Sequence, residues 1–161
     1  MEIERKFILK SLPQTELGEK IEYKRHFIYS KDGVEMRIQQ KGNMFELERK
    51  EKIDNLVSKK EKIEITKEEF DTLKTISNAS IERDSYVISV EGREVSLKVY
   101  RGVYEGLIRA EVEFATKEEA EGYVPPNWFG REITDTVIGK DSNLINFSRK
   151  DFTEEMEKYK N

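Results

Sequence analysis

The sequence predicts an α+β fold: a closed antiparallel β-barrel of about eight strands, forming a tunnel with a charged interior that a few helices cover from outside. Apolar and charged residues alternate along most of the chain, which is the two-residue period of a β-strand. Gly33, Gly42 and Gly92 interrupt this alternation at places typical of tight turns, so neighbouring strands are expected to form antiparallel hairpins.

The first predicted strand is the opening segment MEIERKF, residues 1–7. Successive side chains of a strand point to opposite faces, so Glu2, Glu4 and Lys6 share one face and the apolar side chains lie on the other. The same alternation predicts the other strands at residues 21–29, 34–41, 44–52, 59–66, 85–90, 94–100 and 106–114.

Helical spacing is confined to three segments. Residues 66–77 begin with Thr66, a favourable N-cap, and carry acidic residues in the first turn. Residues 116–123 repeat this arrangement over a shorter length. The tail, residues 141–161, has a partial apolar stripe and is expected to form a C-terminal helix.

Length and composition limit the possible classes of protein. The 161 residues are expected to form a single domain, 1–161, because two domains of ordinary size would need a longer chain. The net charge of −4 combines 29 basic with 33 acidic residues, so we expect no nucleic-acid partner. The absence of cysteine excludes disulfides and thiolate metal sites. We expect no membrane partner, a cytoplasmic location, and a monomer or homodimer.

A charged strand face has an ordinary explanation, since antiparallel sheets often expose one face to water. Here charges of both signs recur on nearly every strand, and helices are available to cover the apolar faces. If the charged faces point into a barrel, lysine and arginine side chains would complement a polyanion, and closely spaced glutamates would suit Mg²⁺ or Mn²⁺. This combination indicates a phosphate ligand accompanied by a metal ion.

Several motifs together resemble a known family. They are the ExExK pattern of residues 2–6, Arg37, KIEIT at 62–66, the ExE pair within 106–114, and WFGREIT at 128–134 followed by Ser-Asn-Leu at 142–144. Their order and spacing are similar to those of the CYTH superfamily, the triphosphate tunnel metalloenzymes, over residues 1 to about 145. The resemblance implies an eight-stranded tunnel that binds a triphosphate and uses Mg²⁺ or Mn²⁺.

The resemblance also implies roles for individual residues. The predicted metal ligands are Glu2, Glu4, Glu64, Glu111 and Glu113, of which Glu4, Glu111 and Glu113 are also the predicted catalytic carboxylates. The predicted substrate-binding cations are Lys6, Arg37, Lys50, Arg83, Lys98 and Arg109, with Lys98 and Arg109 added by the alternation alone. Arg49 replaces Lys50 if the register of its strand shifts by one residue.

Four inward positions depart from the family pattern. Glu35 stands where an arginine is often found, and Lys62 and Lys98 stand where acidic residues are often found. Ser85 occupies the position of an expected cation. Such changes of charge inside a tunnel are expected to alter the shape of the ligand or the competence for catalysis.

The predicted function is metal-dependent hydrolysis of inorganic tripolyphosphate or of a small organic or nucleoside triphosphate. Two alternatives remain open at the level of sequence. One is binding and sequestration of a nucleotide or polyphosphate without turnover, which the four substitutions suggest. The other is the class IV type of adenylyl cyclase from the same superfamily, which would need a base pocket at the tunnel mouth. In each case the expected partner is a small-molecule triphosphate or polyphosphate.

Overall fold

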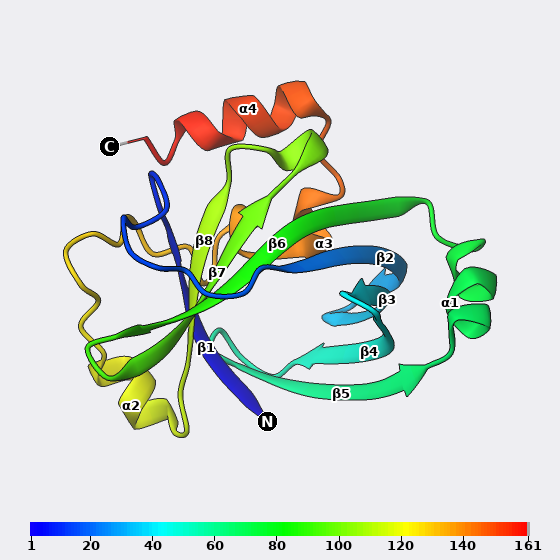
Figure 1. Ribbon diagram of the computed structural model, residues 1–161, viewed down its shortest axis with the longest axis horizontal. Coiled ribbons are helices and arrows are strands. Elements are labelled where there is room, and N and C mark those ends of the chain that lie inside the picture. The colour runs from blue at the N-terminus through cyan, green and yellow to red at the C-terminus, as the bar shows by residue number, and fades with distance from the viewer. Residues whose placement is uncertain (161) are drawn as a thin grey trace.

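A computed structural model describes residues 1–160 and contains a closed barrel of eight antiparallel strands, as the sequence predicts (Figure 1). Around the barrel the strands follow the order β1, β5, β4, β3, β2, β6, β7, β8. Their bounds are β1 Glu2–Ile8, β2 Ile21–Lys31, β3 Val34–Lys41, β4 Met44–Lys52, β5 Val57–Ile65, β6 Ala79–Val90, β7 Arg93–Tyr100 and β8 Ile108–Glu113.

The helices lie on the outside of the barrel or at its ends (Figure 1). They are α1 Lys67–Lys74, α2 Lys117–Gly122, α3 Asp141–Leu144 and α4 Arg149–Glu157, with single 3₁₀ turns at Gly102–Tyr104 and Val137–Gly139. Thr66 caps α1 in a capping box with Glu69, and Thr116 caps α2, as expected. Within residues 1–160, no helix has the length and apolar character needed to cross a membrane.

The apolar faces of the strands form two clusters outside the barrel. One surrounds Phe7, Leu97 and Val112 and is extended by Phe129 and Tyr123. The other gathers side chains of β2, β6 and β7 together with those of α3 and α4. Because β1, β2, β6, β7 and β8 place alternate side chains in these clusters, the charged side chains between them point into the barrel.

The tail differs from its prediction. Two short helices, α3 and α4, replace the single helix expected over 141–161, whose last residue lies outside the described residues. The Ser148 hydroxyl accepts a hydrogen bond from the Asp151 backbone and starts α4 anew. The break lets both Leu144 and Phe152 reach the same cluster, where they are 0% and 1% exposed.

The segment before α3 completes the wall of the barrel beside β1. β1 pairs with β5 only through Glu2 and Ile3, whereas its pairing with β8 runs from Glu4 to Ile8. Beyond the β5 contact, the backbone of residues 130–134 bonds to Lys6 and Ile8 instead. These hydrogen bonds direct the next part of the chain, which leads to Gly139 and Asp141, toward the interior of the barrel.

Gly139 makes that path possible. A Cβ atom at this position would overlap the carbonyl oxygen of Ile133, so only glycine allows the two backbone segments to lie so close. The Gly139 carbonyl accepts a hydrogen bond from Lys6 Nζ at 2.8 Å. Asp141 follows two residues later and is thereby brought to the charged interior.

Candidate active site

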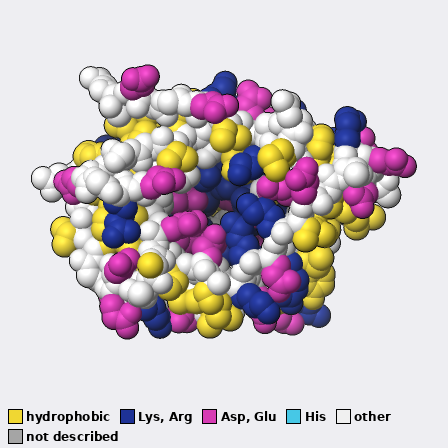
Figure 2. All heavy atoms as spheres, turned by 60° about the horizontal axis from the view of Figure 1, so that its bottom comes forward, with side chains coloured by type: hydrophobic (Ala, Val, Ile, Leu, Met, Phe, Trp, Pro, Cys, Tyr) yellow, Lys and Arg dark blue, Asp and Glu magenta, His cyan; other side chains and the backbone are white. Residues whose placement is uncertain are grey.

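The barrel encloses an open cavity of about 1080 Å³. Side chains from all eight strands and from residues 140–143 line it, and most of them are charged or polar. Figure 2 shows this hollow with lysine, arginine and acidic side chains gathered inside it. The volume lies slightly above the usual range of small-molecule sites, about 300 to 1000 Å³.

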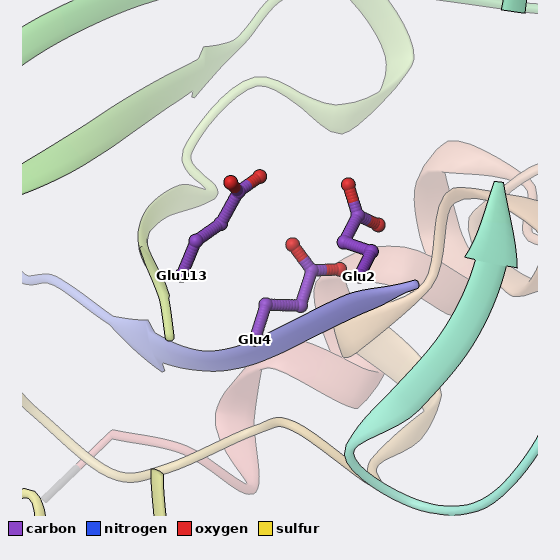
Figure 3. A group of neighbouring side chains, drawn as sticks. All are labelled: Glu2, Glu4 and Glu113. Carbon is purple, nitrogen blue, oxygen red and sulfur yellow. The ribbon is translucent and has the colours of Figure 1, made fainter. Parts of the chain in front are cut away.

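One end of the cavity carries three carboxylates. Glu2 and Glu4 come from β1 and Glu113 from β8, and one oxygen of each lies within 4.8 Å of the others. Figure 3 shows the three side chains pointing into a common space. Glu4 and Glu113 are direct partners in the β1–β8 pairing, which joins two motifs more than a hundred residues apart. We call these three residues the carboxylate end.

Lysines surround the carboxylate end. Lys50 Nζ lies 3.1 Å from an oxygen of Glu2 and 3.1 Å from an oxygen of Glu4. Lys60 Nζ lies 3.0 Å from Glu2, and Lys6 Nζ lies 3.3 Å from Glu4. Each carboxylate of β1 therefore already has a cationic neighbour.

The pKa shifts show how these charges act on one another. Burial raises the pKa of Glu4, but Lys6 and Lys50 more than offset it and lower that pKa to about 2. The pKa of Glu113 is raised by burial and by repulsion from Glu2 and Glu4. A divalent cation bound among the three oxygens would relieve this repulsion, and carboxylate oxygens are the donors that Mg²⁺ and Mn²⁺ prefer. The donor set therefore fits a metal ion.

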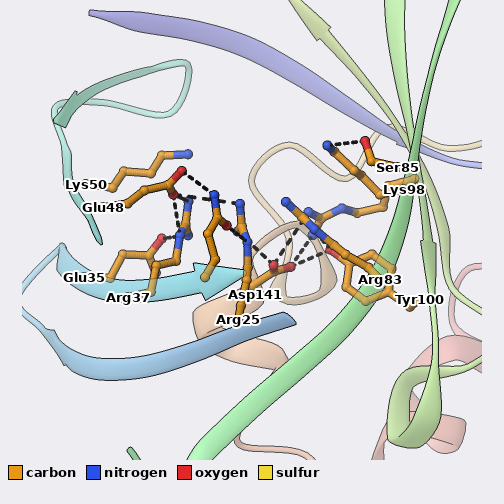
Figure 4. Close-up of polar contacts among 12 residues, drawn as sticks. Arg25, Glu35, Arg37, Glu48, Lys50, Arg83, Ser85, Lys98, Tyr100 and Asp141 are labelled. Carbon is orange, nitrogen blue, oxygen red and sulfur yellow. Dashed lines mark hydrogen bonds and ion pairs between the residues drawn. The ribbon is translucent and has the colours of Figure 1, made fainter. Parts of the chain in front are cut away.

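Arg37 is fixed in the middle of the cavity wall by two carboxylates (Figure 4). Its guanidinium lies 2.8 Å from Glu48 and 2.7 Å from Glu35. Gln39 connects this pair to the next arginine, because its amide donates to Glu48 and its oxygen accepts from Arg25. Glu35, one of the four departures from the family pattern, thus has a cationic partner.

Beyond this network, three arginines meet one aspartate. Oδ2 of Asp141 lies 3.1 Å from Arg25 and 3.2 Å from Arg83, and Oδ1 lies 3.2 Å from Arg109. Tyr100 donates a further hydrogen bond to Oδ1 (Figure 4). Burial raises the pKa of Asp141, but the three guanidinium groups outweigh it and hold the pKa well below its usual range. We call Arg25, Arg83, Arg109 and Asp141 the arginine end.

Lys98 lies beside the arginine end, on the side of Arg83 (Figure 4). Within residues 1–160, no carboxylate oxygen lies within 4.0 Å of its ammonium group. Nζ donates to the Ser85 hydroxyl at 2.8 Å and lies 4.9 Å from the centre of the Tyr23 ring. Burial, followed by repulsion from Arg83, lowers the pKa of Lys98 to about 7. Ser85 and Lys98 are direct partners across β6 and β7, so two departures from the family pattern form one contact.

The structure brings most of the predicted site residues together. The predicted cations Lys6, Arg37, Lys50, Arg83, Lys98 and Arg109 all line the cavity. Arg49 points outward to Glu51, at 3.2 Å, so the register favours Lys50. Lys62, 3.9 Å from Glu46, lies at the rim with its side chain 40% exposed.

Two predicted metal ligands, Glu64 and Glu111, are not among the clustered oxygens of the carboxylate end. Glu64 is exposed and stands opposite Glu46 on β4, because β5 runs away from β1 after two paired residues. Glu111 does line the cavity, but its carboxylate lies 2.7 Å from Arg109. The structure therefore groups Glu113, and not Glu64 or Glu111, with Glu2 and Glu4.

Four charged residues of the site had no predicted role: Arg25, Glu48, Lys60 and Asp141. The first three lie on inward faces that the alternation identifies, so a systematic reading of each strand could have included them. Asp141 had no such signal, since it follows an irregular segment and lies far from the strands in sequence.

No family model matches the chain. The inorganic triphosphatase of Nitrosomonas europaea is 29% identical over 145 residues, which span 89% of this chain and 95% of that protein. The crystal structure of the inorganic triphosphatase NE1496 superposes with a TM-score of 0.68 at 27% identity, covering 90% of this chain and 94% of that one. The PH1012 protein of Pyrococcus horikoshii shares the fold, with a TM-score of 0.58 and 14% identity over 75% of this chain and 84% of its own.

Proposed function

We propose that this chain, a homologue of an inorganic triphosphatase with the tunnel fold of the CYTH superfamily, hydrolyses a triphosphate bound in its cavity. The observation that carries the proposal is the carboxylate end, which lies next to buried and partly buried lysines inside a closed barrel. Carboxylates suited to a metal and cations suited to phosphate oxygens then face one ligand from two sides.

We further propose that Glu2, Glu4 and Glu113 hold a divalent ion, Mg²⁺ or Mn²⁺. When bound there, such an ion supplies positive charge to phosphate oxygens and orients water, which is the usual contribution of metals to phosphoryl transfer. Glu4 is suited to this role because its pKa of about 2 keeps it ionised at neutral pH. Glu113 becomes a better ligand as its proton is lost, so metal binding is expected to strengthen with rising pH.

The lysines and Arg37 would bind the phosphate groups. Lys6 and Lys50 contact Glu4 and line the cavity, so each can turn from a carboxylate to a phosphate oxygen without leaving its place. Arg37 is held on two sides and presents a fixed guanidinium. In hydrolysis of tripolyphosphate, a water oxygen bonds to a terminal phosphorus, the anhydride bond breaks, and phosphate and pyrophosphate are the products. Catalysis would come from positioning and charge stabilisation.

The substrate could be inorganic tripolyphosphate or a small organic triphosphate. Sequestration without turnover gains support from Lys98, a cavity-lining cation at a position where the family often has an acidic residue, which donates to the Ser85 hydroxyl. No feature of the cavity favours the cyclase over hydrolysis. A cytoplasmic location and a monomeric or homodimeric state stay predictions.

The test is product release from tripolyphosphate and ATP with Mg²⁺ or Mn²⁺. Wild type is compared with Glu4→Gln and with a matched control, Glu51→Gln, whose carboxylate lies on the outer face of the same barrel against Arg49. We expect phosphate from wild type and the control, and little from Glu4→Gln. Cyclic AMP and pyrophosphate from ATP would instead identify a cyclase, and tight binding without any product would identify a sequestering protein.

A further inference from the structure

Asp141 has a position that hydrolysis does not explain. It is the first residue of α3, it is 5% exposed, and its two oxygens contact three arginines from three different strands. The backbone around Asp141 is fixed on both sides. Before it in the sequence Gly139 packs against Ile133, and after it Leu144 is fully buried. The arginine end therefore contains a built-in anion.

The arginine end nevertheless has donor groups that Asp141 does not use, and they could bind a further anion. Nε of Arg83 and Nε of Arg109 are buried and have no hydrogen-bond partner in the described part of the chain. Lys98, beside them, has only the Ser85 hydroxyl and the Tyr23 ring as partners. Buried donors and charges without acceptors are costly, so this edge is suited to one phosphate group of a ligand.

The two ends are far enough apart to hold the two ends of one ligand. Arg109 and Glu113 are separated by four residues along β8, which corresponds to about 13 Å of strand. Lys98 is the direct partner of Arg109 across β7 and β8. A phosphate chain that begins at the carboxylate end would therefore meet the arginine end beside Lys98.

We propose that Asp141 determines the length of the substrate: it occupies terminal N–H groups of three arginines, so the arginine end accepts the one phosphate group near Lys98 and is closed to any phosphate beyond it. The proposal rests on the proposed function, in that the ligand is a polyphosphate. An additional phosphate would have to displace a carboxylate that is tied to the backbone, and it would meet a like charge there. The cavity thus selects a chain of three phosphates over longer chains.

The experiment compares the affinities of tripolyphosphate and tetrapolyphosphate by calorimetry, without divalent metal and with EDTA present, so that no turnover is needed. The variants are Asp141→Ser, which removes the carboxylate and opens space, and Asp141→Asn, which keeps the shape and removes the charge. The matched control is Asp84→Asn. Asp84 is another buried carboxylate paired with an arginine, Arg101, but it does not line the cavity.

In wild type and Asp84→Asn we expect tripolyphosphate to bind at least as tightly as tetrapolyphosphate. In Asp141→Ser the preference should shift toward tetrapolyphosphate by about tenfold or more, the usual effect of a new charged hydrogen bond. Asp141→Asn should shift the preference in the same direction by a smaller factor. If Asp141→Ser does not fold, the result with Asp141→Asn decides whether Asp141 sets the length of the ligand.

An unchanged preference in the Asp141 variants would overturn the proposal and leave Asp141 a purely structural residue. A wild type that already prefers tetrapolyphosphate, or that binds neither ligand, would overturn it too. A shifted preference in a protein that releases no phosphate would uphold the role of Asp141 and refute hydrolysis, so the two proposals can fail separately.

Discussion

At the carboxylate end of the cavity two of the three glutamates share Lys50, whereas at the arginine end three arginines share one aspartate. Lysine ammonium groups on long flexible stems exchange partners readily, so the carboxylate end can admit a metal ion and a phosphate without rebuilding the barrel. The guanidinium groups are held by a buried carboxylate that stays ionised. The carboxylate end is therefore suited to catalysis, and the arginine end is suited to limiting how far the ligand extends.

The largest expected effect is loss of turnover at the carboxylate end. Glu4→Gln should lower kcat for tripolyphosphate about 1000-fold, since removing one group that stabilises charge in the transition state typically costs 10²–10³. Steady-state phosphate release measures it, with Glu51→Gln as the control. A Glu4→Gln protein that is folded and fully active would refute the role of the carboxylate end.

Stability should be lost at the arginine end. Arg25→Met should lower the free energy of unfolding by about 3 kcal/mol, because it breaks a buried ion pair and leaves Asp141 with fewer partners. Lys60→Met, which breaks a more exposed pair at the carboxylate end, should lower it by less than about 1 kcal/mol. Urea unfolding measures both values, and equal losses would contradict the difference between the ends.

Gly139→Ala tests the path that delivers Asp141. The added methyl group would overlap the Ile133 carbonyl, so the segment must shift, at a cost of about 2 kcal/mol. Gly122→Ala is the control, because a Cβ atom there meets nothing within 4 Å. If Gly139→Ala retained the stability and the ligand preference of wild type, the close approach of these backbones would not position Asp141.

Lys98 should make stability depend on pH. Its pKa in the folded protein is about 7, below its ordinary value of 10.5, so between these values the unfolded chain binds more protons. Relative to Lys98→Met, wild type should therefore gain stability as pH rises from 7 to 10.5, by about 1 kcal/mol per pH unit. Urea unfolding of both proteins at several pH values measures the slope, and parallel curves would contradict the low pKa.

The smallest effect is expected at the rim. Lys62→Gln removes a lysine whose side chain is 40% exposed and lies 3.9 Å from Glu46. It should change the free energy of unfolding by no more than about 0.5 kcal/mol and should leave kcat nearly unchanged. A large loss of activity would show that the ligand extends to the rim of the cavity.

The sequence predicted the barrel and its inward faces well because alternation and tight turns are local signals. The position of Lys50 inside and Arg49 outside needed only the pairing of β4 with its neighbours. Glu64 could not be placed by alternation, which assigns a face but not a height along the barrel, and β5 carries it away from β1.

Asp141 could not be predicted for a different reason. Its position depends on the irregular chain between α2 and α3, on the contact of Gly139 with Ile133, and on the break that separates α3 from α4. Each of these features depends on tertiary contacts and produces no periodic pattern in the sequence. The predicted helix over 141–161 was wrong at this break, although its apolar residues Leu144 and Phe152 do lie in the core.

The central claim is that Glu2, Glu4 and Glu113 form a metal site separate from the arginine end. A titration with Mn²⁺, in which free Mn²⁺ is followed by its electron paramagnetic resonance signal, tests it directly in wild type, Glu4→Gln and Asp141→Asn. We expect Glu4→Gln to weaken Mn²⁺ binding about tenfold or more and Asp141→Asn to leave it unchanged. Equal binding by wild type and Glu4→Gln would contradict the claim.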